Sequence, residues 1–199
     1  MGNTISIGVI GAGKIGRLHA ENLVYRVPEA RVLAVSDVRR EAAESCAAAL
    51  GIPAAHEDPR AVLEDKRIDA VLICSSTDTH SPLIEAAAAA GKHIFCEKPV
   101  DFDLGRIDEG EYGVKKAGVK LQIGFNRRFD HNFRRVRDAV AEGKLGKLYS
   151  LRITSRDPAP PPIEYVKVSG GMFLDMTIHD FDMARFLTGS EVEERSEER

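Results

Sequence analysis

Apolar and polar positions alternate in blocks along the first 125 residues of the 199-residue chain. Short apolar runs recur, and each is followed by a longer segment with the composition of a helix. The runs predict six strands, at residues 4–10, 31–36, 54–56, 70–74, 93–97 and 120–125. Residues 70–74 are continuously apolar, which is typical of a strand covered on both faces. The pattern therefore predicts an α/β fold with a doubly wound parallel sheet.

The segments between these strands carry helix start and stop signals. Asp58, Ser81 and Asp103 are residue types that cap the N-termini of helices, and Gly51 and Gly91 are typical of helix ends. The helices are predicted at residues 14–26, 39–50, 81–90 and 103–118, with a short one after residue 59.

The pattern changes beyond residue 125. A basic helix is predicted at 133–142, a strand at 148–155 and a strongly apolar helix at 172–187, with a proline-rich extended loop before the last helix. We interpret residues 1–125 as one domain and residues 126–189 as the start of a second, incomplete α+β domain. Residues 190–199 are mostly charged, and we expect them to be disordered.

Composition excludes several classes of protein. The chain is 43% hydrophobic, and it shows neither an apolar run long enough to span a bilayer nor an N-terminal secretory signal. Outside the acidic last ten residues, positive and negative side chains are equal in number, so charge does not favour a nucleic-acid or membrane partner. The three cysteines form neither a CxxC pair nor an even framework, which predicts reduced thiols and a cytoplasmic protein.

The first motif with chemical content is Gly11-x-Gly13-x-x-Gly16, between the first predicted strand and the first predicted helix. Gly11 permits a tight turn, and Gly13 allows a diphosphate to approach the backbone. Gly16 lets the helix pack closely on the strand. The helix begins with Lys14 and Ile15, where backbone N–H groups are offered to phosphates. The context predicts a dinucleotide-binding loop.

An acidic residue, Asp37, ends the second predicted strand, at the spacing expected of a Rossmann dinucleotide-binding unit. Its carboxylate is predicted to accept hydrogen bonds from the adenosine ribose and to repel a 2′-phosphate, which favours NAD over NADP. Arg39 and Arg40 leave NADP open, because either side chain is able to neutralise a phosphate. A tight glycine turn that binds no ligand is the remaining alternative.

Further candidates follow the fourth and fifth predicted strands, because ligands of open α/β sheets bind beyond the carboxyl ends of the strands. Glu97-Lys98-Pro99 follows the fifth strand and directs Lys98 toward the nicotinamide half of a bound dinucleotide. Thr77 and His80 lie on the same rim, after the fourth strand. A solvated lysine and a hydrogen-bonded loop histidine are the corresponding alternatives.

Asp175 and His179 lie four residues apart on the last predicted helix and therefore share a face. Apolar residues on that face predict that the pair is largely shielded from water. A carboxylate that orients an imidazole is what a general base for a hydroxyl proton requires. A structural Asp–His pair, or a metal site that adds Asp180 and Asp182, are the alternatives.

Together, the glycine loop, Glu97-Lys98-Pro99 and the helix with Asp175 and His179 resemble the Gfo/Idh/MocA oxidoreductases. The strings GFNRRFD (124–130) and SGGMFLDMTIHDFDMARFL (169–187) are similar to inositol dehydrogenases within that family. The resemblance implies that His179 takes the proton of a substrate hydroxyl, that Asp175 orients His179, and that Lys98 holds the substrate oxygen. By the same resemblance, Asn126, Arg127 and Asp157 are weaker candidates for residues that contact polyol hydroxyls.

The resemblance implies an NAD-dependent enzyme that oxidises a ring hydroxyl of myo-inositol, or of a similar polyol or sugar, to a ketone. It implies no metal. The predicted cofactor contacts are Gly11, Gly13, Lys14, Ile15, Gly16, Asp37, Arg39, Thr77, His80, Glu97 and Lys98. Another sugar dehydrogenase of the family, a non-catalytic NAD-binding regulator and an inactive fragment are the alternatives.

Two features depart from the family pattern. The family's second domain continues as a large sheet beyond the apolar helix, so we expect a C-terminally truncated chain with an exposed apolar patch and weak or absent turnover. The resemblance implies a homotetramer, whose assembly surface belongs to that sheet. In addition, Gly105, Gly110 and Gly113 lie inside the helix predicted at 103–118, and an interior glycine weakens a helix by about 1 kcal/mol.

Overall fold

The computed structural model describes residues 4–194 and 196. The chain divides into two compact units, Met1–Gly124 and Phe125–Arg199. The division lies one residue before the domain boundary predicted from the sequence. None of the described helices is long and apolar enough to cross a membrane.

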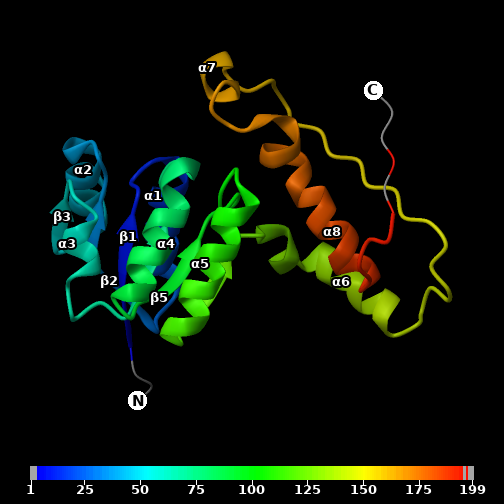
Figure 1. Cartoon of the computed structure of the whole chain (residues 1–199), viewed down its shortest axis with the longest axis horizontal. Helices are drawn as coiled ribbons and strands as arrows, with labels where there is room; N and C mark the ends of the chain where they lie inside the picture. Colours follow the sequence, from blue (N-terminus) through cyan, green and yellow to red (C-terminus); the bar gives the residue numbers. More distant parts are fainter. Residues whose placement is uncertain (1–3, 195, 197–199) are drawn as a thin grey trace. The chain divides into compact units, whose positions relative to one another are not determined.

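The first unit is built on a six-stranded parallel sheet with the strand order β3-β2-β1-β4-β5-β6 (Figure 1). The strands are β1 (Ile5–Ile10), β2 (Ala30–Ser36), β3 (Ala54–His56), β4 (Ala70–Ile73), β5 (His93–Cys96) and β6 (Leu121–Ile123). The predicted doubly wound parallel sheet is confirmed, and each strand lies within two residues of its predicted bounds.

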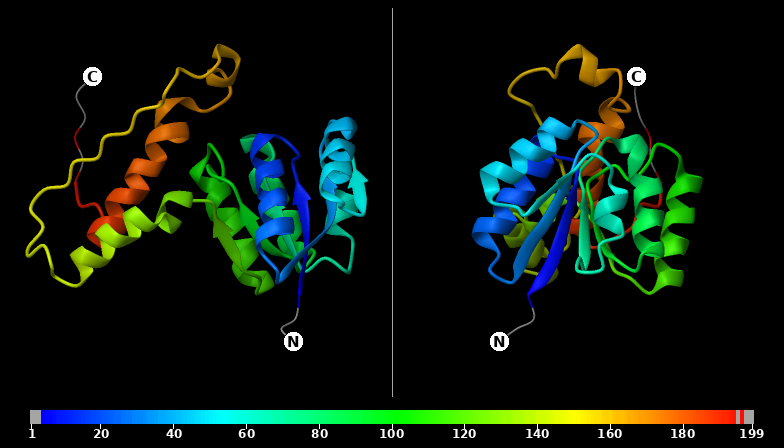
Figure 2. Two further views of the ribbon diagram at one scale, coloured as in Figure 1. Left: turned by 180° about the vertical axis from the view of Figure 1, so that it is seen from behind. Right: turned by 90° about the vertical axis from the view of Figure 1, so that its left-hand side faces the viewer.

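Helices cover both faces of this sheet (Figure 2). They are α1 (Lys14–Arg26), α2 (Arg40–Leu50), α3 (Arg60–Leu63), the 3-10 turn η1 (Thr77–Thr79), α4 (His80–Ala89) and α5 (Leu104–Ala117). Neighbouring strand residues point to opposite faces, so Val9 packs in the cluster under α1 and α2, whereas Ile10 packs in the cluster under α3, α4 and α5. Burial on both faces explains why β4 is continuously apolar.

The second unit is helical in the residues that the structure describes. Its elements are the 3-10 turn η2 (Asn126–Phe129), α6 (His131–Ala141), α7 (Ile163–Val166), the π-helical turn η3 (Phe173–Thr177) and α8 (Ile178–Thr188). The strand predicted at 148–155 is wrong, since those residues form no regular structure. A strand needs a hydrogen-bonded partner, and the described part of this unit contains no other strand.

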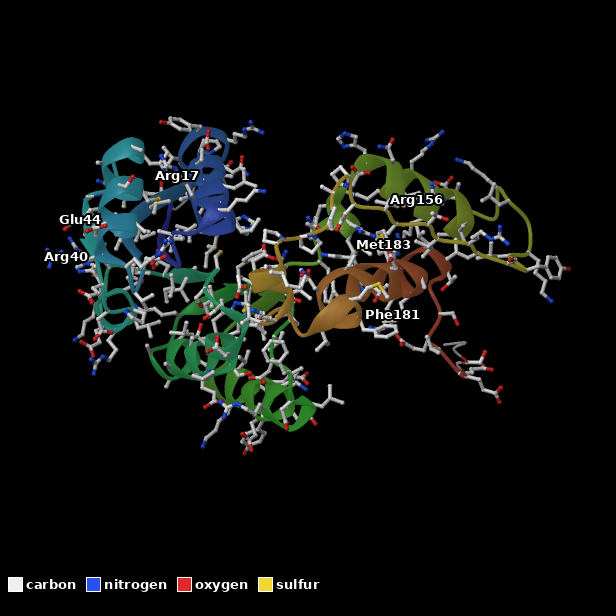
Figure 3. The ribbon with its side chains drawn as sticks, turned by 90° about the horizontal axis from the view of Figure 1, so that it is seen from above. Arg17, Arg40, Glu44, Arg156, Phe181 and Met183 are labelled. Carbon is white, nitrogen blue, oxygen red and sulfur yellow. The ribbon has the colours of Figure 1, made fainter. Side chains whose placement is uncertain are left out.

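Helix α8 shows the exposed apolar patch that the sequence predicts. Met183 is buried on the α6 side, whereas Phe181, on a different side of the helix, is 56% exposed (Figure 3). A shallow groove of about 650 Å³ runs along Phe181 and is lined by the apolar side chains of Leu148, Leu151 and Val192. The second unit thus leaves a large part of its apolar surface uncovered.

The predicted disordered tail is described only in part. Arg185 at the end of α8 donates hydrogen bonds of 2.7 and 2.8 Å to the carboxylate of Glu191. Val192 also lines the groove beside α8, although its side chain is 65% exposed, and the disorder expected for residues 190–199 stays a prediction. Residues 195 and 197–199, on which the prediction of disorder also falls, lie outside the described residues.

Candidate active site

Five strands of the sheet end in register. The residue that follows each of these strands therefore lies in one row along the carboxyl edge of the sheet. Ile10 of β1 pairs with Ser36 of β2 and with Ile73 of β4, and the pairing continues through β5 to β6. The backbone hydrogen bonds extend this register by one further residue on each strand. The row formed in this way consists of Asp37, Gly11, Cys74, Glu97 and Gly124. A site at this edge is where open α/β sheets bind their ligands.

The three glycines of the loop after β1 meet three different surroundings. Gly11 has a φ of +98°, and a Cβ there would lie 2.6 Å from the backbone of Cys74. A Cβ on Gly16 would lie 1.8 Å from the carbonyl oxygen of Gly11, so only glycine lets α1 start this close to β1. A Cβ on Gly13 would meet nothing within 4 Å. The open space at Gly13 is the side from which a diphosphate can approach.

Helix α1 begins directly after this open space. Gly13 is its N-cap, and its first turn contains no acidic residue. The backbone N–H groups of Lys14, Ile15 and Gly16 belong to the first turn, where a helix has no acceptors of its own for them. Together with the helix dipole, these N–H groups suit an anionic group such as a diphosphate. The loop therefore fits the diphosphate of a dinucleotide.

Asp37 lies beside this loop with its side chain only 10% exposed. One carboxylate oxygen accepts a hydrogen bond from the backbone N–H of Ala12 at 2.8 Å, and the other accepts one from Arg39 at 2.9 Å. The Arg39 guanidinium lies 3.6 Å from the same carboxylate. A carboxylate offers about four acceptor positions, so the contacts with Ala12 and Arg39 leave capacity for ribose hydroxyls.

The turn that carries Lys98 is held by residues from two helices. The Glu97 carboxylate lies 2.7 Å from the Nε2 atom of His19 on α1. His80 is 2% exposed, and its Nδ1 atom lies 2.8 Å from the Pro99 carbonyl oxygen. Lys98 between them is half-buried. The predicted contacts of Glu97, Lys98, His80 and Thr77 (in η1) with a cofactor stay predictions.

The thiols of Cys74 and Cys96 lie next to this turn and are unreactive near neutral pH. Burial and, after it, the charge of Glu97 raise the pKa of Cys74 to about 12. Burial is also the main cause of the raised pKa of Cys96. The thiolate is the reactive form of cysteine, so neither side chain is a nucleophile near neutral pH.

In the second unit, Asp175 and His179 lie on either side of the junction between η3 and α8. The Tyr165 hydroxyl donates a hydrogen bond of 2.7 Å to the Asp175 carboxylate. Burial, reinforced by this hydrogen bond, raises the pKa of Tyr165 to about 12, so the phenol stays a donor at neutral pH. The His179 ring packs edge-on against Phe125, with centroids 6.4 Å apart. Both Asp175 and His179 are half-buried rather than largely shielded as expected.

The predicted continuous α-helix at 172–187 contains a π-helical turn at its start. Phe173–Thr177 follows π geometry, in which backbone hydrogen bonds span five residues. The Thr177 hydroxyl donates to the carbonyl oxygen of Met172, five residues earlier, at 3.1 Å. The shared face predicted for Asp175 and His179 assumed regular α-helical spacing, and the turn that contains Asp175 departs from it.

The metal alternative is not supported. Arg127 donates to Asp180 at 2.5 Å and to Ser155 at 3.1 Å, and Arg128 donates to Asp182 at 2.5 to 3.0 Å. Both aspartates therefore serve ion pairs that join η2 to α8. Among residues 4–194 and 196, no group of three or more His, Cys, Asp or Glu side chains is placed to hold a metal ion.

The weaker substrate candidates are the adjacent residues Asn126 and Arg127, and Asp157, thirty residues further along the chain. Asn126 begins η2, and the Arg127 guanidinium is engaged with Asp180 and Ser155. Asp157 lies exposed in the irregular segment before the prolines. Their contacts with a polyol stay predictions.

Two residues of the site were missed in the sequence. His19 lies three residues after Gly16 on α1, so helical spacing places it toward the sheet; that spacing is a signal available from the sequence. Tyr165 lies in α7, just after the proline-rich loop, and no periodic pattern marks it as a partner of Asp175.

Comparison with known proteins agrees with this geometry. Residues 5–125 match the oxidoreductase family with an NAD-binding Rossmann fold, and residues 133–196 match the C-terminal domain of the same family. The sheet and its glycine loop thus define the first unit as the Rossmann domain of an NAD-binding type of oxidoreductase. The chain belongs to the Gfo/Idh/MocA family.

Relatives within the family are inositol dehydrogenases by name. The chain is 55% identical to myo-inositol 2-dehydrogenase of Thermotoga maritima over 188 residues, which cover 94% of this chain and 56% of that protein. It is 50% identical to inositol 2-dehydrogenase of Rhizobium meliloti, with the same two coverages of 94% and 56%. The chain therefore spans little more than half the length of the curated relatives that it matches.

Solved structures give the same result. The crystal structure of a probable dehydrogenase from Thermotoga maritima superposes with a TM-score of 0.92 at 54% identity, over 95% of this chain and 56% of that one. The structure of scyllo-inositol dehydrogenase from Lactobacillus casei with bound NAD(H) and scyllo-inositol superposes with a TM-score of 0.83 at 36% identity, over 94% and 56% of the two chains.

Proposed function

We propose that this chain binds NAD and carries the catalytic groups of an inositol-type dehydrogenase, which oxidises a ring CH–OH to a ketone. The observation that supports the proposal most strongly is the row at the carboxyl edge of the sheet, in which Asp37 and Gly11 are followed by Cys74 and then Glu97. The names of the relatives supply the substrate class, a cyclic polyol.

In this proposal each polar group has one task. The N–H groups at the start of α1 bind the diphosphate, and Asp37 binds the adenosine ribose. Bound NAD supplies the hydride acceptor. His179 accepts the proton of the substrate hydroxyl, Asp175 orients its imidazole, and Lys98 holds the substrate oxygen. The hydroxyl thus loses its proton to the protein as its carbon is oxidised.

We propose NAD rather than NADP as the cofactor. The Asp37 carboxylate is nearly buried beside the loop, and a 2′-phosphate would meet its negative charge. The Arg39 guanidinium, which is able to offset that charge, already lies 3.6 Å from Asp37. This pairing reduces what Arg39 has to offer a phosphate.

The proposal also covers the localisation, the oligomeric state and the turnover of the protein. The three cysteines are free, and burial raises the pKa of each, which suits the reduced thiols of a cytoplasmic protein. The homotetramer that the resemblance implies stays a prediction. We expect turnover by this chain to be weak, because α8 exposes apolar surface next to the catalytic groups of the second unit.

A substrate panel tests the proposal. NADH formation is followed by absorbance with myo-inositol, scyllo-inositol and glucose, each with NAD and with NADP, and NADH binding is measured in parallel by fluorescence. We expect binding of NADH, and slow NAD reduction with an inositol that falls about 100-fold or more in His179→Ala, because a general base is lost. His179→Ala should still bind NADH. Absence of NADH binding, or equal turnover by the variant and the wild type, would contradict the proposal.

The same panel identifies the alternatives. Turnover with glucose and none with an inositol would place the chain among other sugar dehydrogenases. Tight NADH binding without turnover of any polyol would indicate a regulator or an inactive fragment.

A further inference from the structure

Lys98 lies between two residues that are each held by a histidine from a different helix. His19 of α1 contacts Glu97, and His80 of α4 contacts the carbonyl oxygen of Pro99. Both histidines were outside the catalytic set implied by the sequence. Their arrangement raises the question of what they do for the residue between them.

The His19–Glu97 contact is partly buried in the first unit. The side chains of His19 and Glu97 are 28% and 19% exposed, and their atoms Nε2 and Oε1 are 2.7 Å apart. The His19 ring also packs edge-on against Phe95, with centroids 5.2 Å apart. A pair with this little exposure and a packed imidazole differs from a mobile surface pair, which contributes little to stability or position.

The other side of the Glu97 carboxylate faces Gly124 at the end of β6. A Cβ built on Gly124 would lie 3.1 Å from three atoms of that carboxylate. The charge of Glu97 also reaches the buried thiols, since it contributes, after burial, to the raised pKa of Cys74. The carboxylate is thus directed inward, between His19 and Gly124.

His80 holds the opposite end of the turn. Its Nδ1 atom lies 2.8 Å from the Pro99 carbonyl oxygen, and its Nε2 atom lies 3.1 Å from the carbonyl oxygen of Ser75. With 2% exposure, the ring is part of the protein interior. Both neighbours of Lys98 are therefore held by side chains from α1 and α4, Glu97 through its carboxylate and Pro99 through its carbonyl oxygen.

We propose that His19 and Glu97 form a positioning pair that sets the location of Lys98, and that Glu97 anchors this turn instead of binding the cofactor. The proposal rests on the role proposed above for Lys98. Because α1 also carries the diphosphate-binding N-terminus, the pair sets the position of Lys98 relative to the helix that holds the dinucleotide. A small displacement of a group that holds the substrate oxygen lowers the rate of the chemical step more than it lowers binding.

The decisive comparison uses His19→Leu and His19→Gln. Leucine removes the hydrogen-bond donor and leaves the half-buried carboxylate without it, whereas the glutamine amide is still able to donate to Glu97. We expect His19→Leu to lower kcat about 10-fold while the Kd for NADH stays within about 2-fold of wild type. We expect His19→Gln to recover most of kcat. Lys115→Leu, which breaks the exposed Lys115–Glu111 pair, serves as the control and should leave both quantities unchanged.

Three results would overturn the proposal. The first is a wild-type kcat in His19→Leu. The second is a loss of NADH affinity with kcat unchanged, which would make the pair part of the cofactor site. The third is a His19→Gln variant no better than His19→Leu, which would indicate a general loss of packing.

A readout without turnover separates this proposal from the proposed function. The rate of acetylation of Lys98 by acetic anhydride, relative to that of exposed Lys144, is measured by mass spectrometry of peptides from wild type and both variants. A changed Lys98 ratio in His19→Leu, restored in His19→Gln, supports the positioning role even if the wild type turns over no polyol. An unchanged ratio in His19→Leu contradicts it, whatever the fate of the proposed activity.

Discussion

The two units of the chain bury their apolar residues to very different extents. The first unit contains two apolar clusters, one on each face of its sheet, whose members are almost inaccessible. In the described part of the second unit, only Met183 and Leu187 are buried apolar residues. Phe173 and Phe181, by contrast, are more than half exposed.

This difference separates the two halves of the proposed chemistry. The groups expected to bind the dinucleotide stand on a sheet that is complete, with helices on both faces (Figure 2). Asp175 and His179 stand on helices whose apolar surface is largely uncovered. Binding of the cofactor should therefore be robust in this chain, and catalysis should be its weak part.

The largest expected effect on stability comes from comparing a buried apolar residue of the first unit with an exposed apolar residue of the second. Ile73→Ala in β4 removes a side chain that is 0% exposed, and we expect it to lower the free energy of unfolding by about 2–5 kcal/mol. Phe181→Ala removes a side chain that is 56% exposed, and we expect a change several times smaller. Urea unfolding followed by circular dichroism measures both. Equal losses would show that Phe181 is covered in solution and would remove the contrast between the units.

The glycine loop allows stability to be separated from cofactor binding. In Gly16→Ala the new Cβ meets the Gly11 carbonyl oxygen at 1.8 Å, so we expect a loss of about 1–3 kcal/mol or more in stability. In Gly13→Ala the Cβ meets nothing within 4 Å, so the melting temperature should stay near that of wild type. The methyl group should nevertheless weaken NADH binding, because it occupies the approach of the diphosphate. Unimpaired NADH binding by Gly13→Ala would show that the dinucleotide does not lie there.

Helix α5 offers a smaller effect of the opposite sign. A Cβ on Gly113 meets nothing within 4 Å, so Gly113→Ala should stabilise the first unit by about 1 kcal/mol through helix propensity. Gly118, the C-cap of α5, has a φ of +68°, and alanine there should destabilise because that conformation is strained. The two melting temperatures should move in opposite directions. A Gly113→Ala variant that melts with or below the wild type would contradict the expectation.

The smallest expected effect is a loss of stability at acidic pH, through the pair of Asp65 and Arg67. Hydrogen bonds from Arg67 hold the pKa of Asp65 at about 2, below its usual 3.8. A depressed pKa contributes stability above the unfolded value, and that contribution is lost as the pH falls from about 4 to about 2. Asp65→Asn should therefore lower the urea midpoint near neutral pH and make no difference at the acid end of this range. A difference between Asp65→Asn and wild type that does not shrink with falling pH would argue against the pairing with Arg67.

The first unit was largely predictable because its determinants are local. The strands are short apolar runs, Asp103 marks the start of α5, and Gly11 and Gly16 are fixed by close backbone contacts. These features place the dinucleotide loop and Asp37 without knowledge of the rest of the fold. The sheet register then brings Glu97 into the same row, as the parallel order predicts.

The remaining features depend on partners that a local pattern does not contain. Residues 148–155 alternate as a strand does, but no described strand of the second unit pairs with them. The π-helical turn that holds Asp175 contains a side-chain hydrogen bond from Thr177 to Met172, and the spacing of apolar residues does not mark it. Likewise, the link between His19 and Glu97 joins residues 78 positions apart, a contact that only the folded sheet creates.

A fluorescence titration of NADH against the 199-residue chain and its Asp37→Ala variant is the most direct test of a complete cofactor site in the first unit. We expect saturable binding with one site per chain, weakened about 10-fold or more in Asp37→Ala, because charge-assisted hydrogen bonds to the ribose are lost. Failure of the wild type to bind NADH, or the same affinity in both proteins, would contradict that site.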